Sequence, residues 1–150
     1  CNIHAESRLT IVSASLQATM TLAANDNIDI IQLGGMIRHS SVSVVGQYSM
    51  EILRGCSFTK LFLGVDGIDL DFGISTTDMR EAELNRSMMN AAQKTIVLAD
   101  SSKFGRRGFA KISGLEDVDI IITDAKIPQS VANKIEEMGI ELIIAGSQSM

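Results

Sequence analysis

The sequence is poor in several residue types, and each shortage argues against a class of function. Its 150 residues include no Trp, one Tyr and five Phe, too few rings for a base-stacking groove or a sugar-stacking platform. Cys1 and Cys56 form no C-x-x-C pair, and His4 and His39 stand outside any metal-ligand spacing. We therefore expect free thiols in a reducing cytoplasm, although one disulfide in a secreted protein would also fit, and neither a metal nor a cofactor.

Long apolar runs and an excess of positive charge are also missing. No run approaches the roughly 18 residues that span a bilayer, so we expect a soluble protein without a membrane partner. Lys and Arg total 13 against 18 Asp and Glu, which gives a net charge of −5. Because DNA-binding domains are usually basic, these residues alone are not expected to bind DNA.

Short, solid apolar runs are present instead, separated by polar or glycine residues. Strands buried on both faces of a parallel sheet show this pattern, because helices cover both sides. The runs occupy residues 9–12, 28–33, 61–65, 95–99, 118–122 and 140–145.

Amphipathic segments lie between the runs and predict helices over residues 16–24, 47–54, 78–93 and 128–138. Asp78 is suited to be an N-cap, and Glu81 stands three residues later, as in a capping box. Additional strands are expected within 37–45 and 109–112. The order predicts an α/β fold in one domain, 1–150, with a mainly parallel sheet and helices on both faces.

Small and polar residues follow five of the predicted strands. Because the carboxyl ends of parallel strands lie at one edge of a sheet, these segments are expected to meet there and to bind a small, anionic, polyhydroxylated molecule. They are residues 13–15, 34–35, 66–69, 100–103 and 123–124.

Each of these residues also has a purely structural interpretation. Gly34 and Gly35 either admit a ligand close to the backbone or form a tight turn. Asp66 and Asp69 either accept hydrogen bonds from sugar hydroxyls or cap turns. Lys103 either neutralises a phosphate or pairs with a neighbouring Asp.

Residues 73–78, before the longest predicted helix, are a candidate anion site, because N–H groups converge at a helix start. Plain capping by Asp78 would look the same. Glu83, inside that helix, faces either the cleft or solvent, and Arg106 and Arg107 either close over an anion or stay solvated. There is no G-x-G-x-x-G or P-loop pattern and no Ser-His-Asp set, so neither a nucleotide site nor a catalytic set is expected.

Several motifs in series resemble the C-terminal sensor domain of DeoR-family bacterial transcriptional regulators. They are IQLGGM at 31–36, FLGVDGI at 62–68, GISTT at 73–77, VLADSSKFG at 97–105 and DIIITD at 119–124. Taken singly these motifs are weak, but their order and spacing match too. The similarity runs from about Leu9 to Ala145.

The resemblance implies a fold similar to ribose-5-phosphate isomerase and glucosamine-6-phosphate deaminase, and a homo-oligomer. It also implies that a phosphorylated sugar binds the domain and weakens operator binding by an N-terminal winged helix-turn-helix. Carried over to this sequence, the effector-binding residues are Gly34, Gly35, Asp66, Gly67, Asp69, Ser75, Thr76, Thr77, Glu83 and Lys103.

Two features of the family are not found in these 150 residues. The winged helix-turn-helix is absent, and nothing before Leu9 matches the βα unit with an Asp-x-Gly-Thr-Thr phosphate loop that normally opens the sensor domain. We therefore expect a piece of a longer protein, with uncovered apolar surface that favours association with another chain.

Three functions fit this reasoning. The first is ligand sensing for a transcriptional regulator, and the second is a sugar-phosphate isomerase in which Asp66, Asp69 or Glu83 is the base and Lys103 stabilises the enediolate. The third is an oligomerisation module. Sensing is favoured, because residues 75–77 replace the glycine-rich loop of the resembling enzymes.

Overall fold

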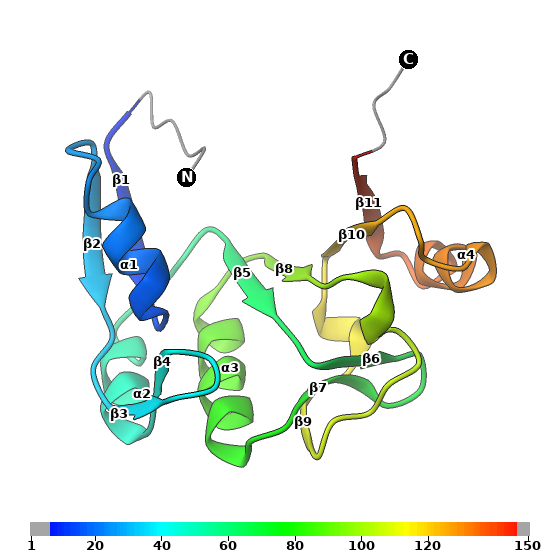
Figure 1. Cartoon of the computed structure of the whole chain (residues 1–150), viewed down its shortest axis with the longest axis horizontal. Helices are drawn as coiled ribbons and strands as arrows, with labels where there is room; N and C mark the ends of the chain where they lie inside the picture. The colour runs from blue at the N-terminus through cyan, green and yellow to red at the C-terminus, as the bar shows by residue number, and fades with distance from the viewer. Residues whose placement is uncertain (1–6, 147–150) are drawn as a thin grey trace. The chain divides into compact units, whose positions relative to one another are not determined.

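The computed structural model describes residues 7–146, so Cys1 and His4 lie outside the described residues. The chain forms two compact units, Cys1–Gly55 and Cys56–Met150 (Figure 1). No Pro-rich or Ser/Gly-rich stretch marks this boundary in the sequence. Within the described part of the chain, no helix is both long and apolar enough to cross a membrane.

Two parallel strands and a helix begin the first unit. Strand β1 (Leu9–Ser13) pairs with β2 (Ile28–Gln32), and helix α1 (Leu16–Leu22) connects them. Ser15 is the N-cap of α1, because its hydroxyl accepts a hydrogen bond from the Ala18 N–H at 3.2 Å. The strands and the helix predicted for this region are confirmed.

A hairpin and a second helix complete this unit. Strand β3 (Met36–Arg38) pairs antiparallel with β4 (Ser43–Val45), and helix α2 (Gln47–Leu53) follows. The additional strand predicted within residues 37–45 is thus two short paired strands and not one. The backbone turns between the two halves, where Val42 adopts a φ of 49°.

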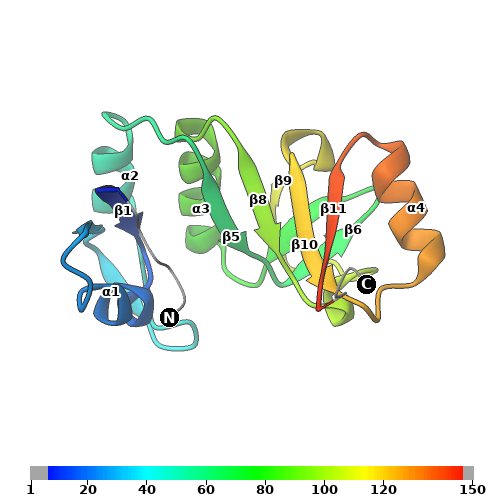
Figure 2. The same cartoon turned by 90° about the horizontal axis from the view of Figure 1, so that it is seen from above.

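Four parallel strands form the main sheet of the second unit, in the order β11-β10-β8-β5 (Figure 2). Helix α3 (Met79–Ala91) separates the first two strands in the chain, and α4 (Gln129–Glu137) connects the last two. The predicted α/β arrangement with a mainly parallel sheet is confirmed. The strands are β5 (Leu61–Gly64), β8 (Thr95–Leu98), β10 (Ile120–Asp124) and β11 (Glu141–Ala145).

A second, antiparallel sheet in this unit has the order β6-β7-β9. Its strands are β6 (Gly67–Asp69), β7 (Gly73–Thr76) and β9 (Ala110–Ser113). Only β9 is predicted from the sequence, and no strand is predicted for residues 67–69 or 73–76. Strands this short show no alternation of apolar and polar residues. Gly73 ends a tight turn with a φ of 100°, a backbone conformation that residues other than glycine rarely adopt.

The core of the second unit covers one face of the four-stranded sheet. Leu63, Val97 and Ile121 are neighbours across β5, β8 and β10, and all three are buried. Phe62 and Leu98 point to the other face and are 60% and 42% exposed. Helices on both faces, and the isomerase-like fold, therefore stay predictions.

Candidate functional site

Three of the five polar segments share one edge of a sheet. Residues 66–69 follow β5, residues 100–103 follow β8, and Asp124 ends β10. Because these strands are parallel neighbours, the segments lie at the same carboxyl edge. Residues 13–15 and 34–35 follow the parallel strands β1 and β2 of the first unit.

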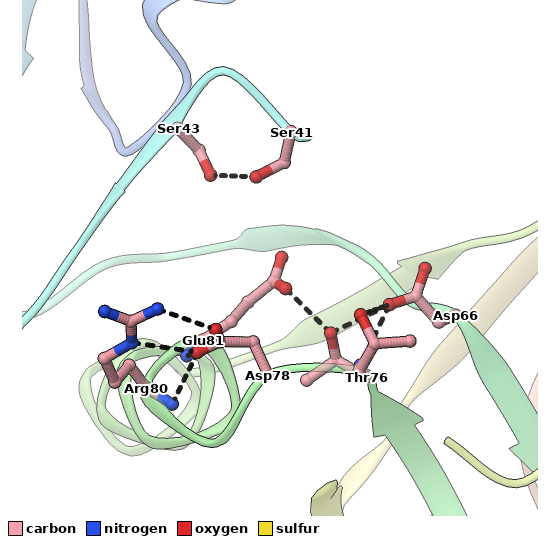
Figure 3. Close-up of polar contacts among 8 residues, drawn as sticks. Ser41, Ser43, Asp66, Thr76, Asp78, Arg80 and Glu81 are labelled. Atoms are coloured by element: carbon pink, nitrogen blue, oxygen red, sulfur yellow. Dashed lines mark hydrogen bonds and ion pairs between the residues drawn. The ribbon is translucent and has the colours of Figure 1, made fainter. Parts of the chain in front are cut away.

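Asp66 is the centre of a polar group at this edge. Its Oδ2 accepts hydrogen bonds from the Thr76 hydroxyl at 2.9 Å, the Thr77 N–H at 3.2 Å and the Thr77 hydroxyl at 3.4 Å. The hairpin of β6 and β7 positions it, because the Asp66 N–H donates to the Ser75 carbonyl at 3.0 Å. Asp66, Thr76 and Thr77, all predicted site residues, are thus brought together, and Figure 3 shows Asp66 beside Thr76.

Glu81 belongs to the same group, and sequence reasoning missed it as a site residue. Its Oε2 lies 2.8 Å from Thr76 Oγ1, and Thr76 stands between Glu81 and Asp66 (Figure 3). The signal was the position of Glu81, three residues after the N-cap. That spacing places its side chain on the first turn of α3, which follows directly after β7.

Asp78 caps α3, as predicted. Its Oδ1 accepts hydrogen bonds from the N–H groups of Arg80 at 2.8 Å and Glu81 at 3.2 Å. The Arg80 guanidinium, 2.9 Å from Oδ2, lowers the pKa of Asp78 from 3.8 to about 2. Capping therefore accounts for the carboxylate in the predicted anion segment.

Asp69 forms an ion pair with another residue of the same unit. Arg107 lies 2.9 Å from its Oδ2, and the Phe72 N–H donates to Oδ1 at 2.8 Å. Arg107 first and this N–H second lower the pKa of Asp69 to about 2. The structure thus gives both Asp69 and Arg107 a role in holding the hairpin, and a ligand role for Asp69 stays a prediction.

Ser75 and Gly67 hold the loop of residues 104–108 against the hairpin. The Ser75 hydroxyl is buried, accepts from the Gly108 N–H at 2.7 Å and lies 3.4 Å from the Gly67 carbonyl. A Cβ on Gly67 would stand 2.5 Å from the Arg106 carbonyl oxygen. Both predicted site residues therefore have a packing role at this position.

Lys103 supplies a cation at the same edge. It ends the short 3-10 helix Ser101–Lys103, whose first N–H donates to Asp124 at 2.8 Å. Hydrogen bonds from Ser102 lower the pKa of Asp100. Within residues 7–146 no ion pair or hydrogen bond of the Lys103 side chain is formed, so its ammonium is available to an anion.

The remaining predicted site residues are Glu83, Gly34 and Gly35. Glu83 is exposed on α3. Gly34 and Gly35 belong to the first unit, where Gly35 has a φ of 148° and a Cβ would meet the Val45 carbonyl oxygen at 2.5 Å. The Ser49 hydroxyl donates to the Gly34 carbonyl at 2.6 Å. These contacts support the tight-turn interpretation of the two glycines.

A cavity of about 330 Å³ lies at the opposite end of the four-stranded sheet. Thr95, which begins β8, and Asp119, which precedes β10, line it together with Arg86 of α3. The Arg86 guanidinium donates to the Lys111 carbonyl at 2.6 Å, and Asp119 accepts from the Thr95 N–H at 2.7 Å. That the carboxyl-edge segments bind a small, anionic molecule stays a prediction.

The carboxyl edge combines carboxylates, which accept hydrogen bonds from hydroxyl groups, with a cation. Asp66 and Glu81 accept hydrogen bonds, and Lys103 offers positive charge to an anion. Among the described residues, no three His, Cys, Asp or Glu side chains gather in a way that could hold a metal ion. The arrangement is suited to binding a molecule that carries both hydroxyl groups and an anionic group.

Residues 2–125 match the family described as the DeoR C terminal sensor domain. The chain belongs to this family. A protein of Escherichia coli O157:H7, named as a repressor of the aga operon, is 39% identical over 81% of this chain and 45% of its own length.

Two further relatives carry names of regulators. The glycerol-3-phosphate regulon repressor of Haemophilus influenzae is 26% identical over 94% of this chain and 54% of its own length. The helix-turn-helix-type transcriptional regulator GlpR of Haloferax volcanii is 29% identical over 89% of this chain and 53% of its own length. This DeoR-type sensor domain therefore spans about half the length of these relatives.

Proposed function

We propose that this chain is the ligand-sensing part of a transcriptional regulator of sugar metabolism, and that this regulator is a repressor. A phosphorylated sugar or a related intermediate binds at the carboxyl edge of β5, β8 and β10. Binding changes the affinity for DNA, which an N-terminal helix-turn-helix contacts, and the regulator acts as a homo-oligomer in the cytoplasm.

The observation that carries this proposal is that Asp66 and Lys103 lie in segments that follow the neighbouring parallel strands β5 and β8, at the same edge of the sheet. Asp66 presents a carboxylate to ligand hydroxyls, and Lys103 presents an ammonium for a phosphate. Names of relatives support the same chemistry, because two of them concern an operon named aga and a regulon named for glycerol 3-phosphate.

A sugar-phosphate isomerase is the alternative. It needs a carboxylate base near the substrate carbon and a cation for the enediolate. Asp69 is already paired with Arg107, Glu83 is exposed on α3, and Asp66 accepts from three donors. These contacts favour sensing, so incubation of the intact protein with aldose phosphates is expected to yield no isomerised product.

Calorimetric titration of the intact regulator tests the proposal. Glycerol 3-phosphate and a set of hexose phosphates are compared with glycerol and the unphosphorylated hexoses. At least one phosphate is expected to bind while its unphosphorylated counterpart does not, and to change affinity for the DNA upstream of the regulator's own gene. Turnover of an aldose phosphate that disappears in Asp66→Asn would instead establish an enzyme.

A further inference from the structure

One hydroxyl hydrogen serves two carboxyl groups at the candidate site. Thr76 Oγ1 lies 2.9 Å from Asp66 Oδ2 and 2.8 Å from Glu81 Oε2, and both distances are those of hydrogen bonds. A threonine hydroxyl carries a single hydrogen. It therefore donates to one carboxylate at a time, and the other close oxygen–oxygen contact has no hydrogen from Thr76.

Because Thr76 is buried, the contact without a hydrogen is energetically costly. Thr76 is 1% exposed, so bulk water does not solvate its hydroxyl, and unfavourable contacts between oxygen atoms are stronger where the local dielectric is low. Asp66 has two other donors in Thr77. The Thr76 hydrogen can therefore leave Asp66 for Glu81 whenever a further donor reaches Asp66.

Charge decides which part of a ligand this group can take. Two carboxylates beside one hydroxyl repel a phosphate, whereas a ligand hydroxyl brings a second hydrogen beside the one that Thr76 divides between its two contacts. The anionic end of a ligand belongs with a cation such as Lys103, which forms no ion pair within residues 7–146.

We propose that Asp66, Thr76 and Glu81 together recognise a ligand hydroxyl and are the specificity-determining group of this sensor. The ligand O–H donates to Asp66, and the Thr76 hydrogen turns to Glu81. Glu81 is a positioning residue that acts through Thr76. This inference rests on the proposed function, since it names which chemical group of the phosphorylated sugar is read, and by which residues.

Thermal unfolding without ligand tests the shortage of hydrogen. In Glu81→Gln the amide donates to Thr76 Oγ1, so the Thr76 hydrogen stays on Asp66 and both contacts are satisfied. Glu83→Gln is the matched control, because it makes the same change of charge at an exposed site two residues along α3. The intact protein with Glu81→Gln is expected to melt about 2 °C or more above the control. An equal or lower Tm would overturn the proposal.

Binding tests the recognition step. The probes are glycerol 3-phosphate and hexose phosphates, each beside its deoxy analogue, together with inorganic phosphate. Glu81→Gln is expected to weaken binding of a hydroxylated probe about tenfold. Binding of its deoxy analogue and of inorganic phosphate is expected to stay unchanged. Thr76→Ser is expected to retain discrimination between the two sugars, and Thr76→Val to lose it.

The outcomes separate the two proposals. Selective binding of a sugar phosphate that ignores both Glu81→Gln and Thr76→Val would overturn hydroxyl recognition and leave the sensor function standing. Failure of every phosphorylated probe to bind the unaltered protein would overturn the proposed function and, with it, hydroxyl recognition, whatever the melting comparison shows.

Discussion

Arg107 holds Asp69 through two contacts, Nε to Oδ2 at 2.9 Å and Nη2 to Oδ1 at 3.0 Å. Asp69 ends β6, and Arg107 lies in the loop before β9, so the pair fastens that loop to the hairpin. The same guanidinium stands 5.5 Å from the centre of the Phe72 ring. The sequence left open that Arg106 and Arg107 close over an anion, but the ion pair with Asp69 fixes this loop at Arg107.

Arg107→Gln is expected to lower the free energy of unfolding at pH 7, and the loss should shrink in acid. Arg107 is the largest of the causes that lower the pKa of Asp69 from 3.8 to about 2, ahead of the N–H groups of Phe72 and Asp71. A lowered pKa gives stability that is complete above about 3.8 and is lost as the pH falls through about 2. Urea unfolding at pH 7 and pH 2.5 measures the difference.

Arg106→Gln is the control, because Arg106 is the exposed neighbour of Arg107 and its substitution makes the same change of charge. It is expected to unfold like the unaltered protein at both pH values. A stability difference for Arg107→Gln that stays constant between pH 7 and pH 2.5 would rule out this role for the ion pair.

Gly108→Ala is expected to lower the free energy of unfolding by about 1–3 kcal/mol, the usual cost of forcing atoms into a packed site. A Cβ there would stand 2.5 Å from the Thr76 carbonyl oxygen and 2.9 Å from its carbon. Gly64→Ala is the control, because among the described residues no atom lies within 4 Å of its Cβ position, and a change below about 1 kcal/mol is expected. Equal effects in chemical denaturation would contradict the close approach.

The parallel strands could be predicted because burial dictates composition. Leu63, Val97 and Ile121 lie in runs of apolar residues with no alternation, and such runs occur in parallel sheets. The hairpin of β6 and β7 could not be predicted in the same way. Its strands have three and four residues, so glycine turns and contacts with distant β9 determine it rather than any local pattern.

The candidate site stays a prediction, and the structure brings only some of its predicted residues together. Asp66 follows from the rule that ligands bind at strand ends, whereas Thr76 and Thr77 follow from the segment before the longest predicted helix, and the three do meet. Glu81 and Glu83 show the limit, because two residues along a helix differ by about 200° in direction. A weak apolar stripe does not fix which of the two faces the sheet, and only packing against β7 selects Glu81.

Asp78→Ala is expected to lower the free energy of unfolding by about 0.5–2 kcal/mol, because α3 loses the acceptor for two N–H groups. Asp78→Asn is the matched variant, since an Asn carbonyl retains the cap and should recover most of the loss. Denaturant unfolding at pH 7 compares the two. If Asn and Ala destabilise the protein equally, the charge pairing with Arg80, and not the cap, matters at this position.

Lys103→Ala is expected to weaken binding of a phosphorylated ligand by about ten- to hundredfold, the usual scale of a charge-assisted hydrogen bond. The reason is that Lys103 ends the segment after β8, at the edge where Asp66 follows β5. Lys134→Ala removes the same charge from an exposed position on α4 and should leave the dissociation constant unchanged. Titration of the intact protein with glycerol 3-phosphate and hexose phosphates measures both. Equal dissociation constants for the Lys103 variant and the unaltered protein would place the phosphate elsewhere.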